Sequence, residues 1–270
     1  MSVVLLLGHP VGHSLSPAMH NAAFRALGLP HSYETYDVTA DALPAAVQRI
    51  RDGEVLGANV TVPYKEAVVK LADTWDGPTA EVGAANTLAR TPDGRVLAAN
   101  PDLVGFEFAT RAVDLQGKRV LLLGAGGAAR AVLAVLFRRG AHVAVANRTA
   151  ERARTLVRTT AHPVELDLGQ VEWADRRDLS GTDVVVNATS LGLSGEDPLE
   201  GASLHPGLVV IDLIPTAAPT PLATRAREAG SLVVDGLPML LQQAVASFQV
   251  WTGKTPPADV MRAALYGSVS

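Results

Sequence analysis

The stretch Val120-Leu121-Leu122-Leu123-Gly124-Ala125-Gly126-Gly127-Ala128-Ala129-Arg130 lies near the middle of the chain and decides its fold. The apolar run 120–123 predicts a buried parallel strand, and the alanine-rich residues after it predict a helix. Gly124, Gly126 and Ala129 fit the fingerprint of a dinucleotide-binding turn, with alanine in the third position. Gly124 permits the tight turn, and Gly126 lets the backbone approach a pyrophosphate that meets the positive end of the helix. We therefore expect a Rossmann-type unit whose ligand is held by Gly124, Ala125, Gly126, Gly127 and Ala128.

The end of the next predicted strand, residues 142–146, distinguishes between two dinucleotides. An NAD site places an acidic residue there, about 20 residues after the turn, to bind the ribose 2′-hydroxyl. This strand instead runs into Asn147-Arg148-Thr149, with Arg152 one helical turn further on. The planar fork of Arg148 suits a 2′-phosphate, and Asn147 and Thr149 can donate hydrogen bonds to it. Thr149 also fits the N-cap of the following helix, which is compatible with phosphate binding, and the expected cofactor is NADP.

Strand and helix patterns extend from this turn in both directions and predict an α/β fold with two domains. We expect strands at 3–7, 32–38, 58–62, 119–123, 142–146, 183–187, 208–213 and 231–234, and a hairpin of 86–89 with 96–99. We expect helices at 16–27, between Thr39 and Gly53, at 64–71, from 101 to about 114, up to 139, and at 149–158, 218–228, 239–252 and 257–266, with Ser16 and Thr39 as N-caps of the first two helices. The predicted domains are an N-terminal α/β substrate domain, 1–101 plus 237–270, and a Rossmann NADP domain, 102–236, with the C-terminal helices packing back onto the first.

The composition of the chain excludes several classes of function. The 270 residues carry a net charge of −4 and no cysteine, and no basic run reaches five residues. We therefore expect no nucleic-acid partner, no disulfide and no thiolate chemistry. The apolar runs 3–7 and 131–137 are too short for a signal peptide and a membrane span. These features favour a cytoplasmic protein without a membrane partner, either a monomer or a homodimer, that acts on a small molecule.

Short polar clusters lie at the ends of predicted strands in the N-terminal half. They are 13–17, 59–65 and 83–87, together with Asp102. The carboxyl ends of parallel strands form the binding crevice of such a sheet. Hydroxyls, carboxamides, a lysine and an aspartate in that position suit a small, polyhydroxylated, anionic ligand. Each cluster alone is typical of turn residues, so the prediction depends on their joint occurrence.

The chain resembles the shikimate dehydrogenase family over nearly its whole length. The matching motifs are Ser14-Leu15-Ser16, Asn59-Val60-Thr61-Val62-Pro63-Tyr64-Lys65, Ala84-Ala85-Asn86-Thr87, 124–130, Asn147-Arg148-Thr149, Asn187-Ala188-Thr189-Ser190-x-Gly192 and Gly236-x-x-Met239-Leu240-x-x-Gln243-Ala244. This resemblance implies NADPH-linked, reversible reduction of 3-dehydroshikimate to shikimate. It also implies roles for single residues. Ser14 and Ser16 would hold the substrate carboxylate, Asn59, Thr61, Asn86 and Gln243 would bind ring hydroxyls, Lys65 and Asp102 would be the catalytic pair, and Asn187, Ala188, Thr189, Gly236 and Met239 would line the cofactor site.

The implied catalytic pair also agrees with the chemistry of the reaction. Hydride transfer at a carbon that bears a hydroxyl needs a group to accept and return the hydroxyl proton. Lys65 and Asp102 can share that proton and would titrate as a coupled pair. Without the surrounding motifs, a solvated lysine and a helix-capping aspartate would be the simpler interpretations.

Two positions depart from the family pattern. Asp212-Leu213-Ile214 is followed by Pro215, where the family usually has tyrosine, so a hydroxyl near the substrate or the nicotinamide is missing. Pro101 precedes Asp102, where threonine is more common. Neither change removes a proton-transfer group, and we expect an active enzyme with altered affinity.

Three other functions compete with this hypothesis. A quinate/shikimate paralogue would carry an acid in place of Asn147-Arg148, and a methylenetetrahydrofolate dehydrogenase would not explain Ser14, Ser16 and Gln243 together. A non-catalytic NADP sensor would not need Lys65 and Asp102. A zinc site at His9, His13 and His20 is rejected because Gly12 and Pro17 break a shared helical face. Domain closure, with hinges near residues 100–103 and 235–238, is a further hypothesis.

Overall fold

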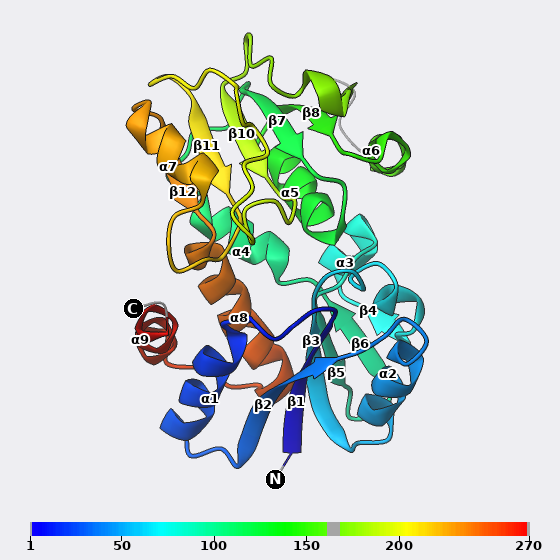
Figure 1. Cartoon of the computed structure of the whole chain (residues 1–270). Coiled ribbons are helices and arrows are strands. Elements are labelled where there is room, and N and C mark those ends of the chain that lie inside the picture. Colours follow the sequence, from blue (N-terminus) through cyan, green and yellow to red (C-terminus); the bar gives the residue numbers. More distant parts are fainter. Residues whose placement is uncertain (1, 161–167, 269–270) are drawn as a thin grey trace. The chain divides into compact units, whose positions relative to one another are not determined.

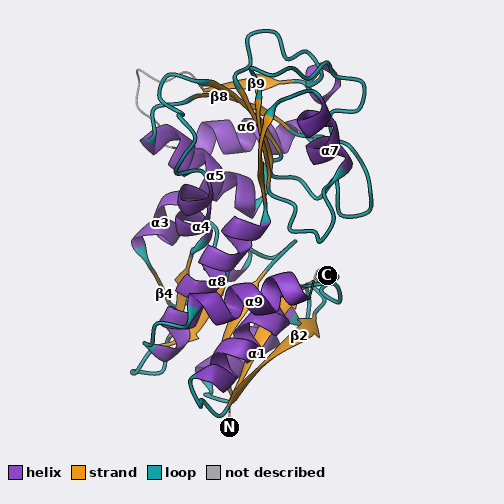
Figure 2. Cartoon of the chain, turned by 90° about the vertical axis from the view of Figure 1, so that its left-hand side faces the viewer, coloured by secondary structure: helices purple, strands orange, loops and turns teal. Residues whose placement is uncertain are grey.

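The computed structural model describes residues 2–160 and 168–268. The chain forms two compact units, each with its own six-stranded sheet (Figures 1 and 2). Unit 1 comprises Met1–Gly105 and Leu240–Ser270, and unit 2 comprises Phe106–Met239. These boundaries fall inside helices α4 (Asp102–Ala109) and α8 (Leu237–Thr252). The predicted boundaries lie a few residues earlier, at the first residue of each helix.

The sheet of unit 2 is entirely parallel, in the order β12-β11-β10-β7-β8-β9. Its strands are β7 (Arg119–Leu123), β8 (His142–Ala146), β9 (Leu168–Val171), β10 (Val184–Asn187), β11 (Val209–Asp212) and β12 (Leu232–Asp235). The chain runs outward from β7 to β9, then returns to β10 on the other side of β7. That reversal is the switch point at which doubly wound sheets bind dinucleotides, so the predicted Rossmann fold is confirmed. The sequence missed β9, whose residues are only half buried and form no apolar run.

The helices of unit 2 are α4, α5 (Gly127–Arg138), α6 (Ala150–Thr159) and α7 (Pro221–Glu228), with a short 3₁₀ helix, η2 (Trp173–Asp175). Helix α7 begins later than the expected residue 218. Thr220 is its N-cap, because the Thr220 hydroxyl oxygen accepts from the N–H of Ala223 at 3.0 Å and Pro221 takes the first helical position. A threonine followed by proline is a common start of a helix, and the prediction of residue 218 did not use it.

The sheet of unit 1 is mixed, in the order β2-β1-β3-β5-β6-β4. Its strands are β1 (Ser2–Gly8), β2 (His31–Asp37), β3 (Val55–Val60), β4 (Thr74–Trp75), β5 (Thr87–Arg90) and β6 (Val96–Ala99). Strand β5 pairs antiparallel with both β3 and β6, as the predicted hairpin requires. We expected every polar cluster to lie at the carboxyl end of a strand, and for Asn86 this expectation is wrong. That residue precedes the amino end of β5, which reaches the carboxyl edge of β3 because β5 runs in the opposite direction.

Helices α1 (Ser16–Ala26), α2 (Leu43–Arg51), α3 (Gly77–Val82), α8 and α9 (Ala258–Gly267) complete unit 1, and α1 packs beside α9 (Figure 2). The C-terminal helices return to the N-terminal sheet, as predicted. The indole N–H of Trp251 on α8 donates to the carbonyl of Leu88 at 3.0 Å. A Cβ on Gly57 would lie 2.5 Å from the same ring, so glycine is what lets the helix approach β3 this closely.

Three local predictions in unit 1 are wrong. The N-cap of α1 is Leu15, and Ser16 is already helical; the N-cap of α2 is Ala42, three residues after Thr39. Residues 64–71 form turns and a short 3₁₀ helix, η1 (Val68–Lys70), in place of a regular helix. There the carbonyl of Lys65 accepts from the N–H of Ala85 at 2.8 Å, which replaces the bond that a helix would make four residues on.

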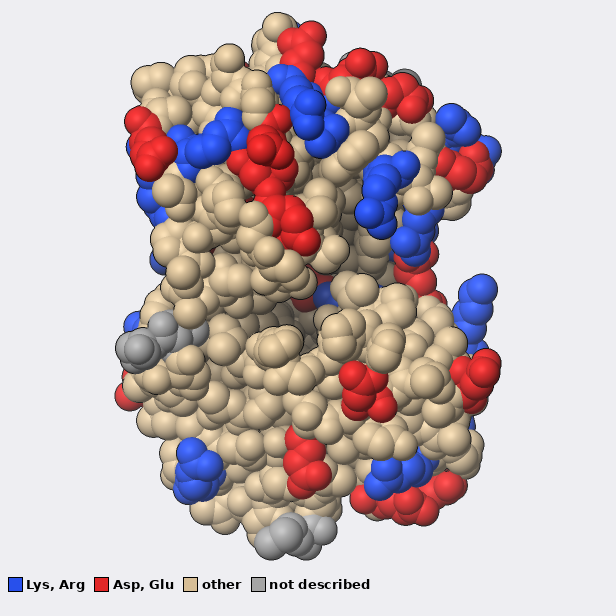
Figure 3. Space-filling view, viewed as in Figure 1, with Lys and Arg blue, Asp and Glu red and all other residues tan. Residues whose placement is uncertain are grey.

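No helix in the described part of the chain is long and apolar enough to cross a bilayer. On the face shown in Figure 3, Lys and Arg side chains alternate with Asp and Glu and do not gather into one patch.

Candidate active site

The side chains of Lys65 and Asp102 form a half-enclosed ion pair in unit 1. Lys65 Nζ donates to Asp102 Oδ2 at 2.5 Å, and the two side chains are 15% and 5% exposed. Lys65 lies in the turns after β3. Asp102 is the first residue of α4, where the positive end of the helix stabilises a carboxylate. The predicted pair is thus brought into contact across 37 positions of sequence.

Asn86 holds the other oxygen of the Asp102 carboxylate. The amide nitrogen of Asn86 donates to Asp102 Oδ1 at 2.7 Å and to Gln243 Oε1 on α8 at 3.1 Å. All three side chains are buried. The backbone N–H of Asp102 also donates to the side-chain oxygen of Asn100 at 3.2 Å. Both oxygens of the carboxylate therefore have a fixed donor, and the orientation of the group is determined.

Asn59 is buried beside Asn86, and its side chain bonds to neighbouring residues through both its oxygen and its nitrogen. Its side-chain oxygen accepts from the hydroxyl of Tyr33 at 2.9 Å. Its amide nitrogen lies 3.0–3.1 Å from the Asn86 carbonyl, Thr87 Oγ1 and Ser247 Oγ. Burial raises the pKa of Tyr33, so its hydroxyl stays protonated and able to donate. The sequence suggested a substrate contact for Asn59; its geometry is that of a buried support for Asn86.

Ser14 and Ser16 lie at the start of α1, and Thr61 lies at the end of β3. Ser14 is half buried, and its hydroxyl oxygen accepts from the N–H of Ser16 at 3.2 Å in the first turn of α1. Ser16 is 5% exposed. Thr61 directly follows β3, and its N–H donates to the Leu7 carbonyl at 2.8 Å. Two hydroxyls at a helix start without an acidic residue suit an anionic group.

The glycine-rich turn of unit 2 has the geometry that its sequence requires. Gly124 has φ +108°, and a Cβ there would lie 2.8 Å from the Ala188 carbonyl oxygen. Both the conformation and the close approach therefore demand glycine. Gly126 is the N-cap of α5, and a Cβ there would project into open space before the helix start. That open backbone is the cradle that a pyrophosphate would fill.

The residues expected at the 2′-phosphate follow β8. Arg148 and Thr149 are exposed, and the amide of Asn147 donates to the Thr149 carbonyl at 2.9 Å, which shapes the turn. Thr149 is the N-cap of α6 by its backbone, without a side-chain capping bond. Glu151, in the first turn of α6, is an acidic residue that was not predicted as part of this site. Its carboxylate forms ion pairs with Arg154 at 3.2 Å and Arg158 at 3.0 Å.

The residues expected around the nicotinamide lie in two places. Asn187, Ala188 and Thr189 form the turn at the end of β10, and Gly236 and Met239 follow β12. Asn187 is fully buried; its amide nitrogen donates to the Leu191 carbonyl and Asp212 Oδ1, and its oxygen accepts from Thr189. The turn carries Ala188 against Gly124. Gly236 is packed so closely that a Cβ would lie 2.6 Å from the Leu213 carbonyl oxygen. Met239 is buried near the start of α8.

Three family models match the chain in consecutive segments. They are the shikimate dehydrogenase substrate binding domain over residues 6–88, shikimate / quinate 5-dehydrogenase over 107–194, and the shikimate 5′-dehydrogenase C-terminal domain over 236–266. The chain is 42% identical over 268 residues to the shikimate dehydrogenase (NADP⁺) of Methanothermobacter thermautotrophicus, covering 96% of this chain and 94% of that protein. The chain belongs to the shikimate dehydrogenase family.

Solved structures of shikimate dehydrogenases share its fold. One that was crystallised in complex with NADP⁺ is similar with a TM-score of 0.88 and 32% identity, covering all of this chain and 96% of that one. The enzyme of Thermus thermophilus, in complex with NADP(H) and shikimate, has a TM-score of 0.81 and 36% identity, covering 99% and 100% of the two chains.

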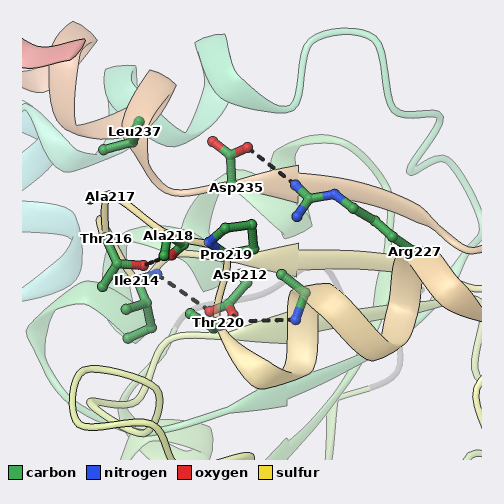
Figure 4. A pocket seen from close by; sticks show the side chains of 11 residues that line it. Asp212, Ile214, Thr216, Ala217, Ala218, Pro219, Thr220, Arg227, Asp235 and Leu237 are labelled. Atoms are coloured by element: carbon green, nitrogen blue, oxygen red, sulfur yellow. Dashed lines mark hydrogen bonds and ion pairs between the residues drawn. The ribbon is translucent and has the colours of Figure 1, made fainter. Parts of the chain in front are cut away.

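One buried polar group of this family member was not predicted as part of the site. Asp212 ends β11, and its carboxylate accepts from the Thr220 hydroxyl at 2.5 Å and from Asn187 at 2.9 Å. Burial raises the pKa of Asp212, although these bonds oppose the shift. Figure 4 shows Asp212 and Thr220 facing each other in a hollow of unit 2, with Arg227 and Asp235 at its edge. The Asp212 carboxylate thus connects the turn at Asn187 to the start of α7. It lies three residues before Pro215, where the sequence departs from the family pattern.

The three N-terminal histidines have separate surroundings. His9 Nδ1 lies 2.5 Å from Asp37 Oδ1 at the surface, and His13 is exposed. His20 is fully buried against the rings of Tyr33 and Trp251. Within residues 2–160 and 168–268, no three His, Cys, Asp or Glu side chains gather as metal ligands would.

Proposed function

We propose that this chain catalyses the NADPH-dependent, reversible reduction of 3-dehydroshikimate to shikimate. The observation that carries the proposal is the contact between Lys65 and Asp102. A lysine ammonium 2.5 Å from a nearly buried carboxylate, on the side of the sheet where the polar clusters meet, is arranged to hold and move one proton. Family membership supplies the substrate class, because the matched relatives carry this activity in their names.

Lys65 and Asp102 act as the proton-transfer pair of this reaction. When bound, NADPH supplies the hydride that reaches the carbonyl carbon of 3-dehydroshikimate. The carbonyl oxygen becomes a hydroxyl by taking the proton that Lys65 shares with Asp102, and in the oxidation direction the pair takes that proton back. Asp102 keeps its orientation during the transfer because Asn86 fixes the oxygen that Lys65 does not use.

The residues of unit 1 that bind the substrate are proposed on charge and position. Ser14 and Ser16 receive the carboxylate at the start of α1, where helix N–H groups add positive potential. Thr61, Asn86 and Gln243 face the ring hydroxyls. Asn59 contributes by holding Asn86 in place, since its own amide is fully used within the protein.

The residues of unit 2 fit NADP better than NAD. The backbone at 124–128 provides the open cradle for the pyrophosphate, with no acidic residue in the first turn of α5. The exposed guanidinium of Arg148 is available for the 2′-phosphate, supported by Asn147, Thr149 and Arg152. Ala188 and Thr189 directly follow β10, where Asn187 shapes the turn, and Gly236 directly follows β12, with Met239 in the first turn of α8.

Shikimate oxidation, measured with NADP and NAD in parallel and with quinate as a second substrate, tests this function. The expected result is NADP-linked oxidation of shikimate. Lys65→Met should lower kcat by at least about a hundredfold, the usual contribution of a proton-transfer group, while NADP binding persists. Lys70→Met, at an exposed lysine of η1, is the matched control and should keep full activity. Wild-type protein without hydride transfer at saturating shikimate and NADP would refute the proposal.

A further inference from the structure

The hydroxyl of Thr87 occupies a position that no proton-transfer or substrate role explains. Thr87 begins β5, is fully buried, and directly follows Asn86. Thr87 Oγ1 lies 2.8 Å from Asn86 Oδ1, 2.8 Å from Ser247 Oγ and 3.1 Å from Asn59 Nδ2. Polar groups from β3, from α8 and from the residue just before β5 therefore surround one hydroxyl.

The direction of the bond between Thr87 and Asn86 is fixed by proton counting. The carboxamide oxygen of Asn86 has no proton, so Thr87 must donate, and its single proton is used there. The Thr87 oxygen then accepts from Asn59 Nδ2 at 3.1 Å. The Ser247 hydroxyl has two acceptors within reach, Thr87 Oγ1 at 2.8 Å and the Gln243 carbonyl at 2.9 Å, and shares its one proton between them. The two protons of the Asn86 amide nitrogen are left to point the other way, one to Asp102 Oδ1 and one to Gln243 Oε1.

We infer that Thr87 is a positioning residue, whose hydroxyl proton holds the Asn86 carboxamide so that its amide aims at Asp102 and Gln243. This inference rests on the proposed function, because it assigns Thr87 an effect on the Lys65–Asp102 pair. Thr87 itself touches neither Lys65 nor Asp102 in any bond of the structure. It acts through Asn86, and the amide of Asn59 donates to the Thr87 oxygen, which leaves the Thr87 proton for the bond to Asn86.

Removal of the hydroxyl has a defined consequence. Valine in place of Thr87 has the same shape but leaves Asn86 Oδ1 buried without a donor, which is unfavourable. The carboxamide then rotates or shifts toward another donor, and the bond from its amide to Asp102 Oδ1 lengthens or is lost. The carboxylate loses one of its two fixed contacts, so the chemical step is impaired more than the binding of shikimate.

Steady-state kinetics of Thr87→Val, Thr87→Ser and Thr79→Val test the inference. We expect Thr87→Val to lower kcat for shikimate oxidation by about tenfold or more, the effect of one unsatisfied buried acceptor, with a KM change of less than about threefold. Thr87→Ser restores the hydroxyl and should restore kcat. Thr79 is an equally buried threonine of α3 whose hydroxyl has no hydrogen-bond partner among the described residues, so Thr79→Val should retain the wild-type kcat.

The outcomes separate positioning from a structural role. A purely structural role would lower the melting temperature and the folded fraction of Thr87→Val but leave kcat per folded enzyme unchanged, and that result would overturn the inference. So would a serine variant as slow as the valine variant, or a rise in KM alone. If the wild type fails to oxidise shikimate, the proposed function fails. If the wild type is active and Thr87→Val equals it, only the role of Thr87 fails.

Discussion

The buried imidazole of His20 predicts a specific loss of stability in mild acid. His20 lies on α1 with its ring stacked on Tyr33 at 4.5 Å between centroids, with Phe248 and Trp251 completing the apolar surroundings. Neither ring nitrogen has a hydrogen-bond partner among the described residues. Burial lowers the pKa of His20 from its ordinary value of 6.5 to about 3. The nearby Asn59 side chain, whose geometry falls short of a hydrogen bond, opposes this shift only in part.

The sign and size of the effect follow from linkage. Because the folded-state pKa lies below the unfolded-state pKa, the unfolded chain binds the proton first as the pH falls. The stability contributed by neutral His20 is therefore complete above about pH 6.5 and decreases toward the folded pKa. Between pH 8 and pH 5 the loss is about 2 kcal/mol, at about 1.4 kcal/mol per pH unit below the unfolded pKa. In this window the loss depends on the unfolded pKa and hardly on the low folded value.

Urea unfolding followed by tryptophan fluorescence at several pH values measures this loss. The free energy of unfolding of the wild type should fall from pH 8 to pH 5 by about 2 kcal/mol more than that of His20→Phe, which keeps a stacked ring without a titrating group. His13→Gln, at an exposed histidine of the same unit, should follow the wild type. Two results would contradict this prediction. One is that the free energy of unfolding of wild type and His20→Phe depends on pH in the same way, and the other is that the His20 ring protons titrate near pH 6.5 by NMR.

Four further variants test the cofactor site and the departure from the family pattern. Arg148→Gln should raise KM for NADP by about ten- to a hundredfold, because charge-assisted hydrogen bonds to the 2′-phosphate are lost, with KM for NAD as the unaffected control. Gly124→Ala should destabilise unit 2, since its Cβ would lie 2.8 Å from the Ala188 carbonyl oxygen at φ +108°. Gly126→Ala should fold with a wild-type melting temperature and bind NADP more weakly; equal melting temperatures for both variants would contradict the geometry. Pro215→Tyr should lower KM for shikimate or NADP by returning a hydroxyl at the end of β11, and unchanged kinetics would show that this hydroxyl is dispensable here.

The sequence was most informative where a structural element depends on neighbouring residues. Strands β7 and β8 were predicted to the residue, because each is a continuous apolar run that a parallel sheet buries on both faces. The Gly124 turn follows from a glycine that the backbone itself requires. Prediction was poorest at 64–71 and at β9, where distant backbone partners or partial burial outweigh local preference.

The candidate site shows the same division. The family resemblance led to Lys65, Asn86, Asp102 and Gln243 as proposed site residues, but it could not say how they contact one another. Gln243 meets Asn86 across 157 positions only because α8 returns to the N-terminal sheet. Thr87 belongs to a matching motif but was given no role, and Ser247 carried no signal, since a serine in a helix is an ordinary residue.

The sequence by itself determined the family and the Rossmann unit and led to the proposed proton-transfer pair, because glycine geometry, apolar periodicity and motif spacing are local properties of the chain. Only the tertiary structure decided which donor faces which acceptor. The antiparallel direction of β5 brings Asn86 to the carboxyl edge of β3, and the burial of Asn59, Thr87 and Asp102 obliges each polar atom to find a partner within the protein. That obligation, which acts through space and not along the chain, gives the site its fixed orientation.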